Sequence, residues 1–115
     1  MQHRITYAGE FDASHQVGSE WPYCTDHLHG HKWQVFIDFH FDPMNPVYPS
    51  KDLDGLLGEL VERNLNDMIR PASPTPLGLA GWLMERLLPR YKVDYVEVTY
   101  NGWGATVKSD DVRRK

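Results

Sequence analysis

The sequence predicts an α+β fold in which two strands come first, two helices follow and two strands close the chain. Two stretches near the start alternate apolar and polar residues, which is the period of a half-buried strand. Apolar residues then recur at helical spacing, and alternation returns near the end. An antiparallel sheet with two helices on one face would bury the apolar sides of all these elements. We expect a single domain over residues 1–115, because this length supports one core and no repeat divides it.

The first two strands are expected from Ile5 to His15 and from His29 to Phe41. In both, the odd-numbered positions are mostly apolar and the even-numbered positions mostly polar. The stretch between them, VGSEWPYCTD (17–26), has the glycine, proline and polar composition of a loop. The polar side of the second strand also carries Phe36, and a mixed surface of this kind favours oligomerisation.

The two helices are expected in the middle of the chain. The first is predicted to start with Ser50 or Asp52 as its cap and to continue as one amphipathic helix to Met68. The second should start at Thr75, with Pro76 in its first turn, and run to Pro89. A closing hairpin then has its first strand over 93–100, a turn at NGWG (101–104) and a short last strand, ATVKS (105–109).

Charge and hydropathy exclude two classes of partner. Twelve Lys and Arg residues against sixteen Asp and Glu residues give a net charge of −4, so there is no basic face for nucleic acid. No apolar run approaches the roughly twenty residues of a membrane helix. The start MQHRITYAGEF lacks the features of a signal peptide. We therefore expect a cytoplasmic protein that binds neither nucleic acid nor a membrane.

The stretch DHLHGHKW (26–33) puts three of the six histidines into five positions. Residues two apart on a strand point the same way, so His29 and His31 share a side, and His15 has the matching parity on the neighbouring strand. Three neutral imidazoles that leave one tetrahedral position open are typical of catalytic zinc. The spacing alone also fits an exposed or hydrogen-bonded histidine pair. His27 has the wrong parity for this cluster, and His3 and His40 are assigned no catalytic role.

Cys24 is the only cysteine, so it cannot form a disulfide within the chain. A lone cysteine in a loop beside histidines is a buried small side chain, a metal ligand or a reactive thiol. The residues by themselves leave these three alternatives open.

The motifs FDASH (11–15) and LHGH (28–31), with a cysteine in the loop between them, resemble the 6-pyruvoyl-tetrahydropterin synthase and 6-carboxy-5,6,7,8-tetrahydropterin synthase family. The resemblance continues through PVYPSKDL (46–53), SPTPLGLAGWL (73–83) and VTYNGWGA (98–105). It implies the tunnelling fold (T-fold), whose four-stranded sheets join into an oligomeric barrel. A homo-oligomer, a trimer or a dimer of trimers, with active sites between subunits is therefore expected.

The resemblance also implies a chemistry and a set of site residues. It implies zinc held by His15, His29 and His31, and a lyase reaction on dihydroneopterin triphosphate or a related small molecule. Zinc lowers the pKa of bound hydroxyls and stabilises an enediolate. The resemblance makes Cys24 the base, with a fourth zinc ligand or an inert thiol as alternatives, and Thr99 a substrate-binding residue.

Four positions depart from the family pattern. Val61 and Glu62 stand where the family has an Asp-His pair that relays protons, and Leu77 replaces the glutamate of a PTSE motif. Val98 precedes Thr99 where the family has a pterin-binding glutamate. Asp26, His27 and Glu97 are candidates to compensate. The departures leave two alternatives: a zinc lyase or aldolase with a non-pterin substrate, and a non-catalytic zinc or small-ligand binding protein.

Overall fold

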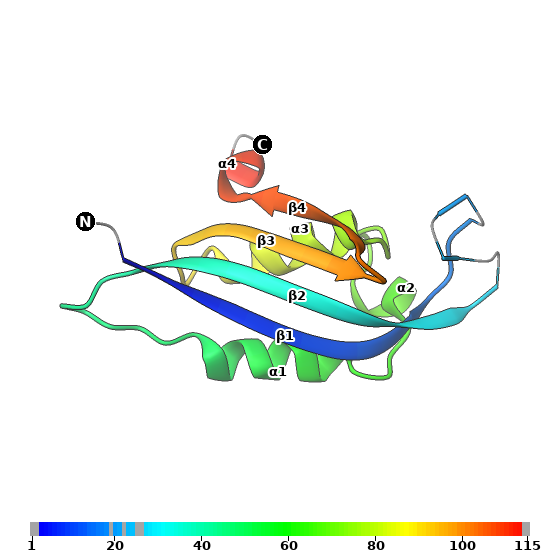
Figure 1. Cartoon of the computed structure of the whole chain (residues 1–115), viewed down its shortest axis with the longest axis horizontal. Coiled ribbons are helices and arrows are strands. Elements are labelled where there is room, and N and C mark those ends of the chain that lie inside the picture. Colours follow the sequence, from blue (N-terminus) through cyan, green and yellow to red (C-terminus); the bar gives the residue numbers. More distant parts are fainter. Residues whose placement is uncertain (1–2, 19, 22, 25–26, 114–115) are drawn as a thin grey trace.

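The computed structural model describes residues 3–18, 20–21, 23–24 and 27–113. Its four strands form one antiparallel sheet in the order in which they occur along the chain (Figure 1): β1 (His3–His15), β2 (His29–Phe41), β3 (Val93–Tyr100) and β4 (Trp103–Lys108). The helices are α1 (Ser50–Leu60), α2 (Leu65–Met68), α3 (Pro76–Leu87) and α4 (Ser109–Arg113). The predicted α+β class and the strand and helix order are confirmed, with α2 and α4 as additional short helices. None of the helices in these described ranges is long and apolar enough to cross a membrane.

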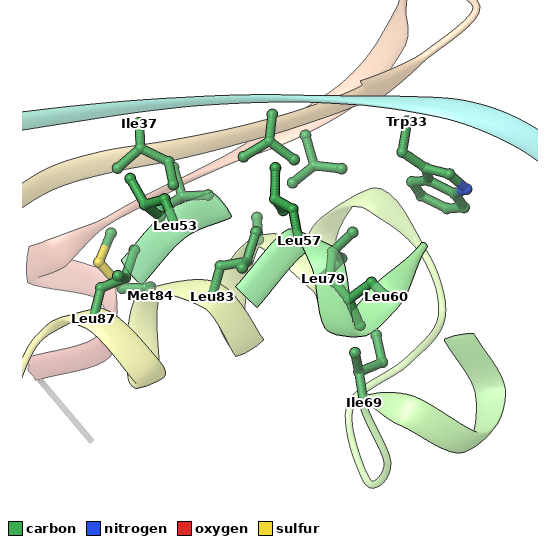
Figure 2. Packing of buried hydrophobic residues seen from close by; sticks show 14 of the residues in the cluster. Trp33, Ile37, Leu53, Leu57, Leu60, Ile69, Leu79, Leu83, Met84 and Leu87 are labelled. Atoms are coloured by element: carbon green, nitrogen blue, oxygen red, sulfur yellow. The ribbon is translucent and has the colours of Figure 1, made fainter. Parts of the chain in front are cut away.

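The core lies between one face of the sheet and the helices α1 and α3. Figure 2 shows Trp33 and Ile37 of β2 facing the leucines of both helices. Trp33, Ile37, Leu53 and Leu83 are all fully buried. Apart from Asp38 and Val93, which lie at a register shift between β2 and β3, the buried strand residues are those of the apolar parity, because removing one side of each strand from water drives the packing. The predicted pattern of apolar and polar faces is therefore confirmed.

The prediction of one helix from Ser50 or Asp52 to Met68 is wrong. Ser50 is the first residue of α1, Pro49 is its N-cap, and the helix ends at Leu60. The following segment turns through Glu62, whose φ of 57° lies in the left-handed region. The Glu62 N–H donates to the Asp12 carbonyl at 2.6 Å and the Ser14 N–H donates to the Arg63 carbonyl at 2.9 Å. Pairing with the edge of β1 thus competes with the helix and stops it.

The predicted start of the second helix is confirmed, but α3 ends at Leu87 rather than Pro89. Thr75 caps α3 by accepting a hydrogen bond from the Gly78 N–H at 3.2 Å, with Pro76 as the first residue of the helix.

The closing hairpin is also confirmed, with a turn shorter than 101–104 because Trp103 and Gly104 already belong to β4. The β3–β4 turn is formed by Asn101 and Gly102, whose φ values of 51° and 77° match the left-handed conformation that a two-residue hairpin requires.

The second face of the sheet carries polar side chains. Arg4 Nη1 lies 2.9 Å from Asp38 Oδ2 and 2.7 Å from Asp94 Oδ2. Thr6 donates to Asp38 at 3.1 Å, and His40 Nε2 lies 2.6 Å from Asp94 Oδ1. This network lies near the start of β1, and the histidine-rich end of the sheet is the other end of that strand.

Candidate metal centre

Four potential metal ligands meet at the end of the sheet where β1 stops and β2 begins. His15 is the last residue of β1 and pairs directly with His29, the first residue of β2. His31 follows two residues later with the same parity, and the loop between the strands supplies Cys24. His15 is fully buried, and the other three side chains are half-buried. Strand pairing therefore brings together the three histidines that the sequence singled out.

Three distances within this group are close to those around a tetrahedral metal. One ligand atom from each of the four residues lies within 4.8 Å of the others. The Nε2 atoms of His15 and His29 are 3.1 Å apart, and Cys24 Sγ lies 3.4 Å from His15 Nε2 and 3.7 Å from His31 Nε2. Around tetrahedral zinc, two nitrogen ligands are separated by about 3.3 Å and a nitrogen and a sulfur by about 3.6 Å. The donor set is thus consistent with a metal site.

Backbone carbonyls orient two of the imidazoles. His15 Nδ1 lies 2.6 Å from the Pro74 carbonyl oxygen, and His29 Nδ1 lies 2.7 Å from the His27 carbonyl oxygen. Each carbonyl is an acceptor, so Nδ1 carries the proton and the Nε2 lone pair points into the cluster. Metal-binding histidines are commonly held this way.

Burial favours the neutral form of two of the imidazoles, His31 and His15. It lowers the pKa of His31 to about 4, with a further lowering by the neighbouring His15 and His29. Burial also lowers the pKa of His15, although the hydrogen bond to Pro74 acts in the opposite direction. Since only a neutral imidazole can bind a metal, these shifts favour the ligating form at neutral pH.

Tyr100 is a residue of the site that the sequence did not single out. Its hydroxyl lies 3.4 Å from Cys24 Sγ, and its ring stacks on His31 with 4.1 Å between ring centroids and 13° between planes. Burial raises the pKa of Tyr100, and the hydrogen bond to Cys24 adds to this effect. The phenol is therefore neutral and able to donate. The sequence showed which face of β3 carries Tyr100, but only the β2–β3 register, which sets Thr99 opposite Gln34, brings the Tyr100 ring close enough to stack on His31.

Two other residues considered for the site lie on the opposite face. Val98 is fully buried and faces the helices, so its neighbours Glu97 and Thr99 point to the second face of the sheet. Thr99 donates to Gln34 at 3.3 Å, and Glu97 accepts from the Thr106 hydroxyl at 3.4 Å. Within one chain, neither residue is brought to the metal centre.

The other positions that depart from the family pattern, and the residues that could compensate for them, do not form one group. Val61 and Leu77 are exposed. Glu62 lines an open hollow of about 410 Å³ beside β1, together with Asp12, Ser14 and His31 among others. His27 contributes its carbonyl to His29. Asp26 lies outside the described residues.

Comparisons with known proteins agree with this architecture. The family model described as 6-pyruvoyl tetrahydropterin synthase matches residues 4–102. The structure of Caenorhabditis elegans 6-pyruvoyl tetrahydropterin synthase is similar, with a TM-score of 0.76, 18% identity, and coverage of 94% of this chain and 96% of that one. An uncharacterised protein from Wolinella succinogenes is also similar, with a TM-score of 0.72, 18% identity, and coverage of 94% and 98%. No curated protein matches the sequence.

The antiparallel sheet with its helices on one face defines a T-fold protein, and the cluster at the end of the sheet adds four side chains that could hold a metal ion. This chain belongs to the 6-pyruvoyl tetrahydropterin synthase family.

Proposed function

We propose that the protein is a zinc-dependent lyase that acts on dihydroneopterin triphosphate or a related small molecule. The observation that carries this proposal is the convergence of donor atoms from His15, His29 and His31 beside a single thiol. Two of the imidazoles have their outer nitrogens held by carbonyls, which leaves the inner nitrogens available as ligands. A preorganised donor set of this kind is what a catalytic zinc site requires.

In this proposal His15, His29 and His31 hold the metal, and Cys24 is the base. When bound, zinc would supply a Lewis acid for the hydroxyls of the substrate side chain and for the negative charge that forms on them. The Cys24 sulfur removes a proton from the carbon next to the developing carbonyl. Its distances of 3.4 and 3.7 Å from two imidazole nitrogens are equally those of a fourth ligand, which is the alternative role for this thiol.

Substrate recognition is proposed to involve a second copy of the chain. Thr99 and the metal centre lie on opposite faces of one sheet, so a substrate that touches both would be bound between subunits. The sheet has β1 and β4 at its two edges, and edge strands can pair with another copy. We propose a homo-oligomeric barrel, either a trimer or a dimer of trimers.

The burial of Val98 favours a second candidate function. A valine in the core offers no acceptor for the N–H groups of a pterin, and an unpaired buried donor costs about 1–3 kcal/mol. Val61 and Glu62 also remove the family's Asp-His pair, a general acid–base contribution commonly worth on the order of 10²–10⁴ in rate. A zinc lyase or aldolase with a non-pterin substrate, or a non-catalytic binding protein, would retain the same metal centre.

The test is to mix the zinc-loaded protein with dihydroneopterin triphosphate and to identify products by mass spectrometry. We expect slow, zinc-dependent conversion that is lost in Cys24→Ala, while His3→Ala, exposed at the start of β1, serves as a control. Rapid conversion would show that Val61, Glu62 and Val98 have been matched to the wrong family positions. No conversion with zinc bound would favour the second candidate function.

A further inference from the structure

Three aromatic residues connect the loop that carries Cys24 to the β3–β4 hairpin. We call them the aromatic bracket: Trp21, Tyr100 and Trp103. The Trp21 and Trp103 rings meet edge to face with 5.5 Å between centroids, and the Trp103 and Tyr100 rings are 5.8 Å apart. The Cys24 N–H donates to the Trp21 carbonyl at 3.1 Å. The bracket therefore links the backbone at Cys24 to the hairpin through packed rings.

Tyr100 touches both kinds of ligand in the metal centre. Its hydroxyl lies 3.4 Å from Cys24 Sγ, and its ring lies parallel to the His31 imidazole. The Tyr100 side chain is fully buried, and Trp33 packs against it with 5.0 Å between centroids. A ring enclosed in this way has little freedom to rotate, so it can fix the groups it contacts.

We propose that Tyr100 is a positioning residue of the metal centre: its hydroxyl holds the Cys24 sulfur and its ring holds the His31 imidazole. One rigid side chain thereby sets the spacing between a thiol on a loop and a ligand on a strand. The strands by themselves position only the histidines, since Cys24 lies outside both. This role rests on the proposed function, in which Cys24 is the base, and adds the residue that holds the Cys24 sulfur in position. The contacts of Tyr100 with Cys24 and His31 can be tested without measuring turnover.

The chain has one cysteine, so alkylation reports on Cys24 alone. Tyr100→Phe removes the hydroxyl and keeps the ring. We expect iodoacetamide to alkylate the metal-free variant about two- to tenfold faster at pH 7, since the lost hydrogen bond had occupied the sulfur and held it in place. Tyr95→Phe, which removes a hydroxyl from the second face of the same strand, should react at the wild-type rate. Both variants should still bind one zinc ion per chain.

Two further variants test the rest of the bracket. Trp103→Leu removes the contacts to Trp21 and Tyr100 and should also speed alkylation. Tyr100→Leu removes the ring from His31 and should weaken zinc binding in a competition with a chelator by about two- to tenfold.

An unchanged alkylation rate in Tyr100→Phe would overturn the role of the hydroxyl, and unchanged zinc affinity in folded Tyr100→Leu would overturn the role of the ring. Because neither measurement uses a pterin, failure of the lyase assay leaves both results interpretable.

Discussion

The Pro74 carbonyl oxygen lies 2.6 Å from His15 Nδ1, across 59 positions of the sequence. Pro74 directly precedes Thr75, the N-cap of α3. The cap fixes the direction in which the chain enters the helix, and the carbonyl just before it then orients a histidine at the end of β1. A helix start thus also supports the metal centre, because the hydrogen bond selects the tautomer that leaves Nε2 free to bind.

The first prediction concerns the zinc ligands. The wild-type protein should bind one zinc ion per chain, and His29→Ala and His31→Ala should each lose it, because three ligands are needed to hold the ion and only two histidines remain. Metal analysis after gel filtration, with circular dichroism to verify the fold, measures this. His3→Ala, exposed at the start of β1, is the control and should keep its zinc. Stoichiometric zinc in both site variants would rule out the assignment.

The second prediction concerns pH and the metal-free protein. The pKa of His31 is about 4 in the folded state and about 6.5 in an unfolded chain. Because of this lowered pKa, the unfolded state binds more protons than the folded state below pH 6.5. The contribution of His31 to the unfolding free energy is therefore complete above pH 6.5 and is lost as the pH falls toward 4. The loss should be no more than about 1–2 kcal/mol, since His31 is partly exposed.

Urea unfolding of chelator-treated protein between pH 7.5 and 4.5 measures this change. His31→Ala should flatten the dependence of the unfolding free energy on pH, whereas His3→Ala should not. Identical pH profiles for wild type and His31→Ala would contradict the prediction.

The third prediction concerns Val98. Val98→Glu would restore the carboxylate at the family position, but this side chain is fully buried among apolar residues. We expect the unfolding free energy to fall by about 3 kcal/mol or more, since an unpaired charge would enter the core. Thr99→Glu, half-exposed on the other face, should change it by no more than about 1 kcal/mol. Equal stability of the two variants in urea would show that Val98 does not face the core.

The fourth prediction is that the protein is a trimer or a dimer of trimers. Segment 61–64 covers the edge of β1 only beside residues 12–14, where it bonds to Asp12 and Ser14. The rest of β1 and the outer edge of β4 have no strand beside them in the described part of the chain, and such edges favour pairing between copies. Light scattering at micromolar concentration should give three or six times the mass of the chain. A monomeric mass would refute the oligomer.

The sequence by itself determined the features that depend on neighbouring residues. Alternation fixed the strands and their buried faces, Thr75 and Pro76 fixed the start of α3, and Asn101-Gly102 fixed the hairpin turn. The shared parity of His15, His29 and His31 placed them on one side of the sheet. These signals are local because backbone geometry repeats every two or 3.6 residues.

Only the tertiary structure decided the features that depend on pairing between distant segments. The edge of β1 ends α1 at Leu60, although helical spacing continues to Met68. The β2–β3 register puts Tyr100 beside His31, and the entry to α3 puts the Pro74 carbonyl beside His15. No local period encodes such contacts, because they arise only when separate elements pack on one core. In that packed state, the hydrogen bonds and ring contacts between segments outweigh the local preferences of the chain.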